Sequence, residues 1–178
     1  AGATAVLSST DLKSISFLDR LSAAGISSFK IEGRMKSPYY VATVVNAYRQ
    51  YMDGKASLDE CDRELDCASH RPYASGFYFG EAKASPENDG LYRQSCSFIG
   101  IVLGETPDGG YTVEMRNRFK KGDVLEILSP HSMGEKLTVL GITGENGESK
   151  DEAVLVQDKV TVYCDKRLCM GDRRRKRT

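Results

Sequence analysis

Four charged side chains lie close together where an apolar segment of the sequence ends. They are Lys30, Glu32, Arg34 and Lys36. Gly33 among them lets the chain turn sharply or approach a ligand closely. A carboxylate at position 32 can transfer protons, and a guanidinium at position 34 can bind a phosphate or a carboxylate. The alternative is an ion pair that only fixes the end of the segment. The candidate catalytic residues are Glu32, Arg34 and Lys36, with Lys30 as a candidate substrate-binding residue.

The segments around this bend predict the elements that position it. Residues 26–31 alternate between apolar and polar side chains, which predicts a short strand. Residues 10–24 predict a helix with Gly25 as its stop, and residues 37–52 predict a second helix that starts at Ser37-Pro38. Helix, strand, charged turn and helix form a unit of a parallel α/β fold, in which residues after the carboxyl end of a strand line the active site.

Two aromatic residues begin the second predicted helix. Tyr39 and Tyr40 are candidate substrate-binding residues, because a tyrosine ring can stack on a nucleic-acid base. The alternative is burial of one ring in the core, which is common for a tyrosine at a helix start.

The composition excludes several classes of protein. The 178 residues include 25 basic and 25 acidic side chains, so any affinity for nucleic acid must come from a local patch. No apolar run approaches the ~18–20 residues of a membrane span, and no secretory signal is visible. The five cysteines suggest a reducing compartment, hence the cytoplasm, and their spacing predicts no metal site. The oligomeric state is not indicated.

The later part of the chain changes character at about residue 97. Before it, Ser57 and Glu60 predict a capping box on a third helix that extends to about residue 67. An aromatic loop follows over residues 69–80, and a polar linker over 81–94. The β-rich part has six candidate strands, which predict a small barrel of roughly 80 residues. They span residues 98–103, 111–115, 124–128, 137–142, 153–156 and 160–163.

A basic patch surrounds one aromatic residue at a predicted strand end. Lys120 belongs to it, and its candidate substrate-binding residues are Arg116, Arg118, Phe119 and Lys121. Such a patch suits contacts with an RNA backbone and stacking on a base, and the alternative is a solvated hairpin tip. Residues 173–177 are five consecutive basic residues, which indicate either a nucleic-acid-binding tail or a disordered one.

The two histidines do not complete a catalytic pair. His70 lies in a predicted loop and His131 in a predicted turn, and neither has a nucleophile motif nearby. We expect both to be structural, which weakens a peptidase interpretation of this chain. Only one parallel strand is predicted, and its hydrogen-bonding groups would stay unpaired. We therefore expect the chain to be the C-terminal portion of a longer protein.

Several motifs together resemble peptidase family U32, a collagenase-like family that includes RNA-hydroxylation proteins. The most specific is Phe-Lys-Ile-Glu-Gly-Arg-Met-Lys-Ser-Pro-Tyr-Tyr-Val-Ala at residues 29–42. Asp11-Leu12, His70-Arg71 and the segments 76–78, 98–100 and 119–126 also fit. The resemblance implies an α+β chain: the last elements of a TIM-like barrel over 1–53, a helical and aromatic linker over 54–95, and a β-barrel like the second domain of elongation factors over 96–178.

The resemblance also implies a function. Some members of the family are described as collagen-degrading proteases, and others support base hydroxylation in tRNA or rRNA. We expect this chain to act in RNA base hydroxylation, with the β-barrel as the substrate-binding module, and to be inactive alone. The alternatives are a genuine protease or a non-catalytic binding module for RNA or protein. RNA-modifying members are associated with an iron–sulfur cluster, and many carry a cysteine where this chain has Lys13. A cluster is therefore expected only in the full-length protein and not in this chain.

Overall fold

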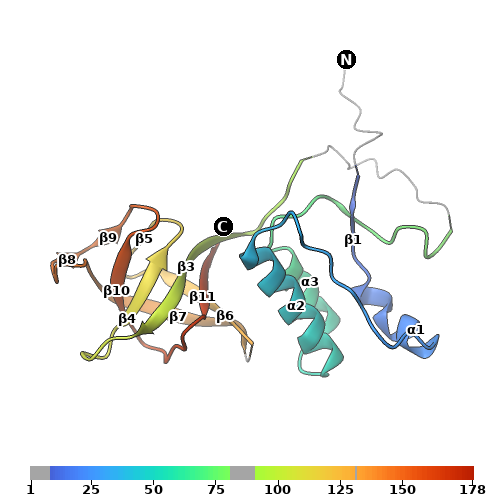
Figure 1. The fold of residues 1–178 in the computed structure, drawn as a ribbon, viewed down its shortest axis with the longest axis horizontal. Coiled ribbons are helices and arrows are strands. Elements are labelled where there is room, and N and C mark those ends of the chain that lie inside the picture. The colour runs from blue at the N-terminus through green and yellow to red at the C-terminus, as the bar shows by residue number, and fades with distance from the viewer. Residues whose placement is uncertain (1–8, 81–90, 131) are drawn as a thin grey trace, which may run out of the picture. The chain divides into compact units, whose positions relative to one another are not determined.

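The computed structural model describes residues 9–80, 91–130 and 132–178 (Figure 1). The chain divides into two compact units, Ala1–Gln94 (unit 1) and Ser95–Thr178 (unit 2). No helix in the described ranges combines the length and the apolar character that crossing a membrane requires.

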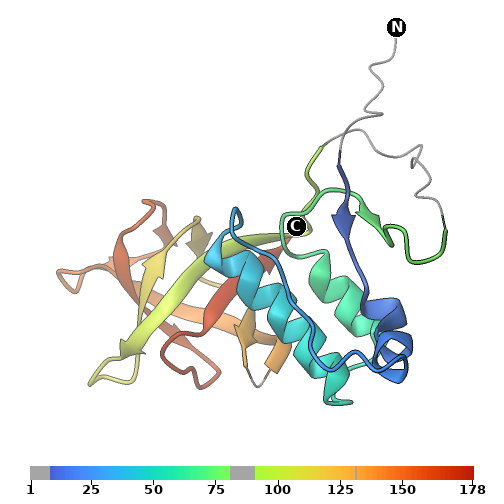
Figure 2. The ribbon, with the colours of Figure 1, turned by 45° about the vertical axis from the view of Figure 1, so that its right-hand side comes forward.

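Two helices form the centre of unit 1. Helix α2 spans Pro38–Met52, and helix α3 spans Leu58–Leu65 (Figure 2). The Ser37 side chain caps α2 by accepting a hydrogen bond from the Tyr40 backbone N–H at 3.2 Å. Ser57 and Glu60 form the predicted capping box at the start of α3. Both helix starts are therefore confirmed, because they depend on residues adjacent in the sequence.

Helix α2 buries a different face from the one suggested by its apolar residues. Val44 and Ala47 are buried, but Val41, Val45 and Met52 are exposed. The buried face also includes polar side chains, namely Thr43, Asn46 and Gln50. Packing between α2 and α3 decides which face is covered.

The predicted helix over residues 10–24 is only partly correct. The sequence forms strand β1 (Asp11–Leu12), a 3₁₀ turn η1 (Ile15–Phe17) and helix α1 (Leu18–Ala23). Strand β1 pairs in parallel with β2 (Tyr73–Ala74), a strand inside the predicted aromatic loop. This pairing draws the first residues out of the helix. Gly25, with φ of +90°, ends α1 as predicted.

The predicted strand over residues 26–31 is wrong. These residues form no strand in the structure, because no other segment of the described chain supplies a hydrogen-bonding partner. The charged bend therefore follows an irregular segment. The described elements of unit 1 do not form a barrel, and their assignment to the end of a TIM-like barrel stays a prediction.

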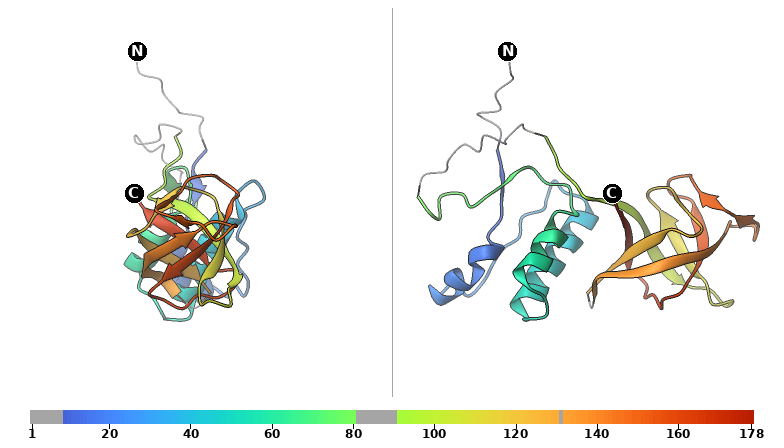
Figure 3. Two further views of the ribbon diagram at one scale, coloured as in Figure 1. Left: turned by 90° about the vertical axis from the view of Figure 1, so that its left-hand side faces the viewer. Right: turned by 180° about the vertical axis from the view of Figure 1, so that it is seen from behind.

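Unit 2 is a small closed β-barrel (Figures 1 and 3). Its sheet follows the order β10-β4-β3-β11-β6-β7-β8, with all pairs antiparallel, and β7 also pairs with β10. That last pairing closes the ring and leaves no free edge among the six strands that form it in the described structure. The main strands are β3 (Cys96–Glu105), β4 (Tyr111–Met115), β6 (Val124–Ser129), β7 (Ser132–Thr143), β10 (Lys159–Cys164) and β11 (Arg173–Arg177).

Short strands complete the barrel, and inward-facing side chains fill it. Strand β5 (Phe119–Lys120) pairs with β9 (Glu152–Ala153), and β8 (Ser149–Lys150) extends the sheet beside β7. Of the strand predicted over residues 153–156, only Ala153 is in a strand, and Val154 to Val156 are exposed. The core contains Ile99, Val113, Met115, Leu125, Leu137 and Val162, among other residues.

The five basic residues at 173–177 are not a tail. They form β11, which hydrogen-bonds to β3 on one side and to β6 on the other. Arg174 and Arg175 are fully buried, and Glu126 accepts hydrogen bonds from Arg175 and Arg177. Burial lowers the pKa of Arg174 to about 10, so its guanidinium stays charged at neutral pH. The prediction of a disordered tail is therefore wrong, because backbone pairing inside the barrel orders this segment. Nucleic-acid binding by this segment stays a prediction.

Candidate functional site: a charged cluster beside a cavity

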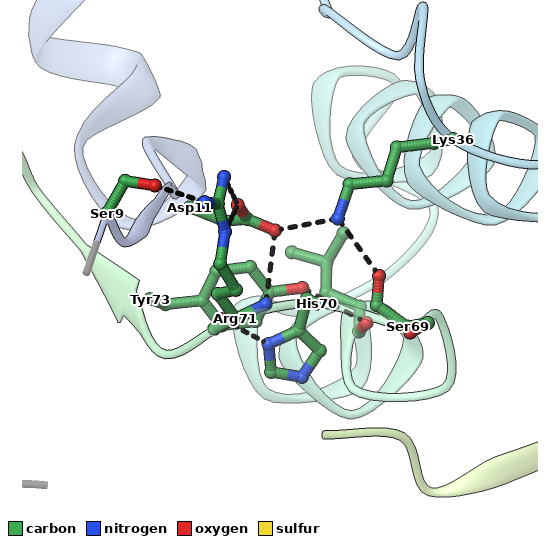
Figure 4. Close-up of polar contacts among 8 residues, drawn as sticks. Ser9, Asp11, Lys36, Ser69, His70, Arg71 and Tyr73 are labelled. Carbon is green, nitrogen blue, oxygen red and sulfur yellow. Dashed lines mark hydrogen bonds and ion pairs between the residues drawn. The ribbon is translucent and has the colours of Figure 1, made fainter. Parts of the chain in front are cut away.

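A partly buried carboxylate in unit 1 joins three segments that are distant in sequence (Figure 4). Asp11 accepts a hydrogen bond from Lys36 Nζ at 3.1 Å, and others from Arg71 Nε at 3.0 Å and the Arg71 backbone N–H at 3.2 Å. Lys36 Nζ also donates to the Ser69 carbonyl at 3.2 Å, and the Arg71 guanidinium donates to the Ser9 hydroxyl. We call Asp11, Lys36 and Arg71 the charged cluster.

The charged cluster carries more positive than negative charge. Burial of Asp11 opposes its ionisation, but the contacts with Lys36 and Arg71 outweigh burial and hold the pKa of Asp11 below its ordinary value. One ionised carboxylate then faces two cations. Lys36 Nζ also lies over the rings of Tyr40 and Tyr92, at 4.8 and 4.7 Å from their centroids. The excess positive charge suits an anionic ligand.

A cavity of about 720 Å³ lies beside the charged cluster. The candidate catalytic residues Glu32, Arg34 and Lys36 all line it, as does Lys30. Polar side chains on its wall include Thr10, Ser14, Ser28, Tyr40, Tyr48 and Arg71. No histidine or cysteine is among the described residues that line it, so the cavity there offers no Ser-His or Cys-His pair.

The bend itself is held loosely. Glu32 pairs with Lys30 at 3.4 Å, and their side chains are 71% and 85% exposed, so this ion pair adds little stability. Arg34 is exposed and makes no ion pair within the described part of the chain. The predicted alternative, an ion pair between Glu32 and Arg34, is not formed. Lys36 differs from both, because Asp11 holds it in a partly buried ion pair.

Of the two tyrosines at the start of α2, one lies in the core and the other lines the cavity. Tyr39 is 4% exposed, and its hydroxyl donates to the Cys67 carbonyl at 3.4 Å. The prediction that Tyr39 stacks on a base is therefore wrong, because the Tyr39 ring is part of the core. Tyr40 lines the cavity, and burial together with the nearby Asp11 carboxylate raises its pKa.

The residues of the basic patch predicted in unit 2 also differ in burial and in contacts. Phe119 is 2% exposed and belongs to the barrel core, so its predicted stacking role is wrong. Arg116 pairs with Glu114 and donates to the Met115 carbonyl at 3.2 Å. Arg118 and Lys121 are exposed and stay candidate binding residues.

The predicted structural role of His70 agrees with its surroundings. Its ring is buried and stacks on Tyr73, with 4.0 Å between the ring centroids. Nδ1 lies 2.7 Å from the Arg71 carbonyl, and Nε2 lies 3.6 Å from the Asp66 carboxylate. His70 therefore orders the chain next to Arg71. His131 lies outside the described residues.

Sequence spacing did not identify Asp11 and Arg71 as site residues. They are 60 positions apart, and no local pattern connects them. The signal was present in the motifs Asp11-Leu12 and His70-Arg71, which contain both residues.

Cys61 does not fit the role of an iron–sulfur ligand. Its thiol is buried and donates to the Ala47 carbonyl at 3.4 Å. Burial raises its pKa to about 11, whereas a cluster ligand must be a thiolate.

Comparison with known proteins identifies the family. Residues 2–88 match the profile of peptidase family U32, and residues 94–172 match the profile of the peptidase family U32 C-terminal domain. The chain belongs to peptidase family U32. Unit 2 thus corresponds to the C-terminal domain of the family.

Three relatives in this family have names that refer to two activities. The tRNA hydroxylation protein P1 of Bacillus subtilis is 33% identical over 96% of this chain and 43% of its own length. The tRNA hydroxylation protein P of Escherichia coli is 34% identical over 71% of this chain and 30% of its own length. A collagenase of Porphyromonas gingivalis is 35% identical over 43% of this chain and 23% of its own length. The chain thus spans less than half the length of these relatives.

Proposed function

We propose that this chain acts, within a U32 protein, in the hydroxylation of tRNA bases in the cytoplasm. In this proposal the cavity of unit 1 binds an anionic part of the substrate, and the barrel of unit 2 binds RNA. The observation that carries the proposal is the extent of similarity. The B. subtilis tRNA hydroxylation protein matches 96% of the chain, through both units, whereas the collagenase matches 43%.

The geometry of unit 1 supports an anionic substrate. Four cationic side chains line the cavity, namely Lys30, Arg34, Lys36 and Arg71, against the two carboxylates Asp11 and Glu32. A phosphate group is bound well by a guanidinium, and Arg34 has no competing ion pair in the described structure. Glu32 is then free to act on a proton of the substrate, because its partner Lys30 is exposed and weakly bound.

Lys36 has a positioning role in this proposal. Its side-chain nitrogen is held by Asp11 and by the Ser69 carbonyl, so it is fixed at the wall of the cavity. Because Lys36 directly precedes the cap of α2, it links the charged bend to the helix.

A proteolytic function is the second candidate, favoured by the similarity to the collagenase. It predicts release of fragments from gelatin by the full-length protein. The described lining of the cavity contains no histidine or cysteine, which supports the first candidate over this one.

The proposal is tested in the full-length protein that contains this chain. A bacterium that lacks its own U32 tRNA-hydroxylation protein is supplied with the wild type or a variant, and hydroxylated nucleosides in its tRNA are quantified by mass spectrometry. Arg34→Ala is expected to reduce hydroxylation about 10-fold or more, because a charge-assisted contact is worth ~1.5–3 kcal/mol. Arg63→Ala is the matched control, because Arg63 is an exposed arginine of α3 outside the cavity.

Two results would reject the proposal. One is a wild-type protein that restores no hydroxylation while it degrades gelatin. The other is an Arg34→Ala variant that restores as much hydroxylation as Arg63→Ala at equal protein abundance.

A further inference from the structure

Two basic segments of unit 2, more than 50 residues apart in sequence, meet at one polar cavity. The cavity has a volume of about 470 Å³, and its cationic side chains are Arg118, Lys120 and Lys176. Arg118 and Lys120 come from the predicted basic patch, and Lys176 comes from the segment that forms β11. The remaining lining residues are Ser97, Ile99, Asn117, Phe119, Asp123 and Glu152.

Strand pairing brings Lys176 to this cavity. In β11, Lys176 is paired with Ser97 of β3, another lining residue. Its ammonium group donates to Asp123 at 2.8 Å, and Asp123 also accepts from the Lys120 backbone N–H at 3.1 Å. The Lys176 side chain is still 43% exposed, so its cation is held in place and remains accessible.

Asp123 works as a fixed anchor for this lysine. Burial of the carboxylate opposes ionisation, but Lys176 and the Lys120 backbone N–H outweigh burial and keep the pKa of Asp123 below its ordinary value. Asp123 is therefore ionised at neutral pH and neutralises one cation. The other charged side chains on the wall are Arg118, Lys120 and Glu152, so the cavity keeps one excess positive charge.

The chemistry of the wall suits a phosphate and a sugar rather than a base. The cations Arg118, Lys120 and Lys176 can contact phosphate oxygens. The hydroxyl of Ser97 and the amide of Asn117 can bond to a sugar hydroxyl. Phe119 is buried, so its ring is not available as a stacking platform. We therefore expect contacts that do not depend on base identity.

We propose that this cavity binds the backbone phosphate and ribose of RNA, with Arg118 and Lys176 as the main cations. The proposal rests on the function proposed above, because it assigns the RNA-binding role of the barrel to one location. Asp123 is the positioning residue, since it holds Lys176 at the wall.

The test uses the 178-residue chain and a fluorescently labelled oligouridylate, with binding measured by anisotropy over a series of salt concentrations. Arg118→Ala and Lys176→Ala are each expected to weaken binding about 10-fold at low salt. Each is also expected to reduce the slope of log affinity against log salt by about 0.7, the value for one phosphate contact on a single strand. Lys136→Ala, a change at an exposed lysine of β7 outside the cavity, should stay within about twofold of the wild type.

Lys176→Ala leaves Asp123 without its partner, so its circular dichroism spectrum and thermal unfolding are compared with those of the wild type. Arg118 is exposed, so Arg118→Ala should leave the fold intact and should test binding separately from stability. Unchanged affinity and salt slope in folded Arg118→Ala would overturn the inference. So would polyglutamate that competes as well as unlabelled oligouridylate, because the cavity would then fit an acidic protein.

The two proposals fail in different ways. If the cavity variants lose RNA binding but the wild-type full-length protein restores no tRNA hydroxylation, only the proposed function is rejected. If hydroxylation is restored and the cavity variants bind RNA normally, only the assignment of this cavity is rejected.

Discussion

The replacement Glu126→Gln should destabilise unit 2 severely. Glu126 is 7% exposed and accepts hydrogen bonds from Arg175 at 2.9 Å and from Arg177 at 3.0 Å. The Arg175 side chain is fully buried and forms an ion pair with Glu126. A glutamine retains one acceptor oxygen but removes the negative charge, so the ion pair with the buried cation is lost.

The magnitude is large relative to the stability of a unit of this size. Removal of one partner of a buried ion pair costs about 3–5 kcal/mol. A domain of this length has a free energy of unfolding of roughly 4–13 kcal/mol. Because glutamine retains one hydrogen bond, we expect the lower end of this range, a loss of about 3 kcal/mol in the free energy of unfolding. At ~4–8 °C per kcal/mol, the melting temperature of unit 2 should fall by at least ~12 °C.

The matched control is Glu135→Gln. Glu135 pairs with Lys166 at 3.0 Å, but the two side chains are 46% and 44% exposed, so the loss should stay below about 1 kcal/mol. Thermal unfolding is followed by calorimetry, and hydrogen exchange at the backbone amides of β11 assigns the transition to unit 2. If Glu126→Gln costs no more than Glu135→Gln, charge compensation by Glu126 does not stabilise the strand.

Three further predictions concern packing, capping and pH. Gly100→Ala places a Cβ 2.6 Å from a backbone oxygen of β4 and should lower the unfolding free energy by about 1–3 kcal/mol in urea titrations. The control is Gly104→Ala, whose new Cβ meets nothing within 4 Å. Equal losses of unfolding free energy in the two variants would contradict the prediction. Ser57→Ala removes the cap of α3 and should cost about 1 kcal/mol in the same titrations, with Ser57→Thr close to the wild type. Contacts with cations hold the pKa values of Asp11 and Glu126 below their ordinary values of 3.8 and 4.5, despite burial. At low pH the unfolded chain then binds more protons than the folded chain. The stability that these two carboxylates contribute should be fully present above about pH 5 and should fall as the pH drops through their folded pKa values. Measurement of the unfolding free energy over an acid titration tests this, and an unfolding free energy that stays constant down to about pH 2 would refute it.

Much of the local structure could be predicted from the sequence. The cap at Ser37, the capping box of α3 and the stop at Gly25 all formed as predicted, because each depends on residues within one turn of one another. Strands β4, β6 and β10 also follow their predicted segments closely, because alternating apolar residues fill the barrel interior.

The sequence also contained the motifs that show the family, and it placed the charged bend that lines the cavity of unit 1. It did not show how the bend is anchored. The contacts of Asp11 with Lys36 and Arg71 join residues 25 and 60 positions apart, and only the folded chain determines which charges meet.

Only the tertiary structure determined the conformation of two other segments and the burial of Phe119. Residues 26–31 have the alternation of a strand but no partner in the described chain, so they form none. Residues 173–177 have the composition of a disordered tail, but β3 and β6 supply partners on both sides and make them a central strand. Phe119 lies in a basic sequence, yet its side chain fills the barrel core. A strand needs hydrogen-bonding partners and a core residue needs an enclosing surface, and both come from residues far away in the sequence.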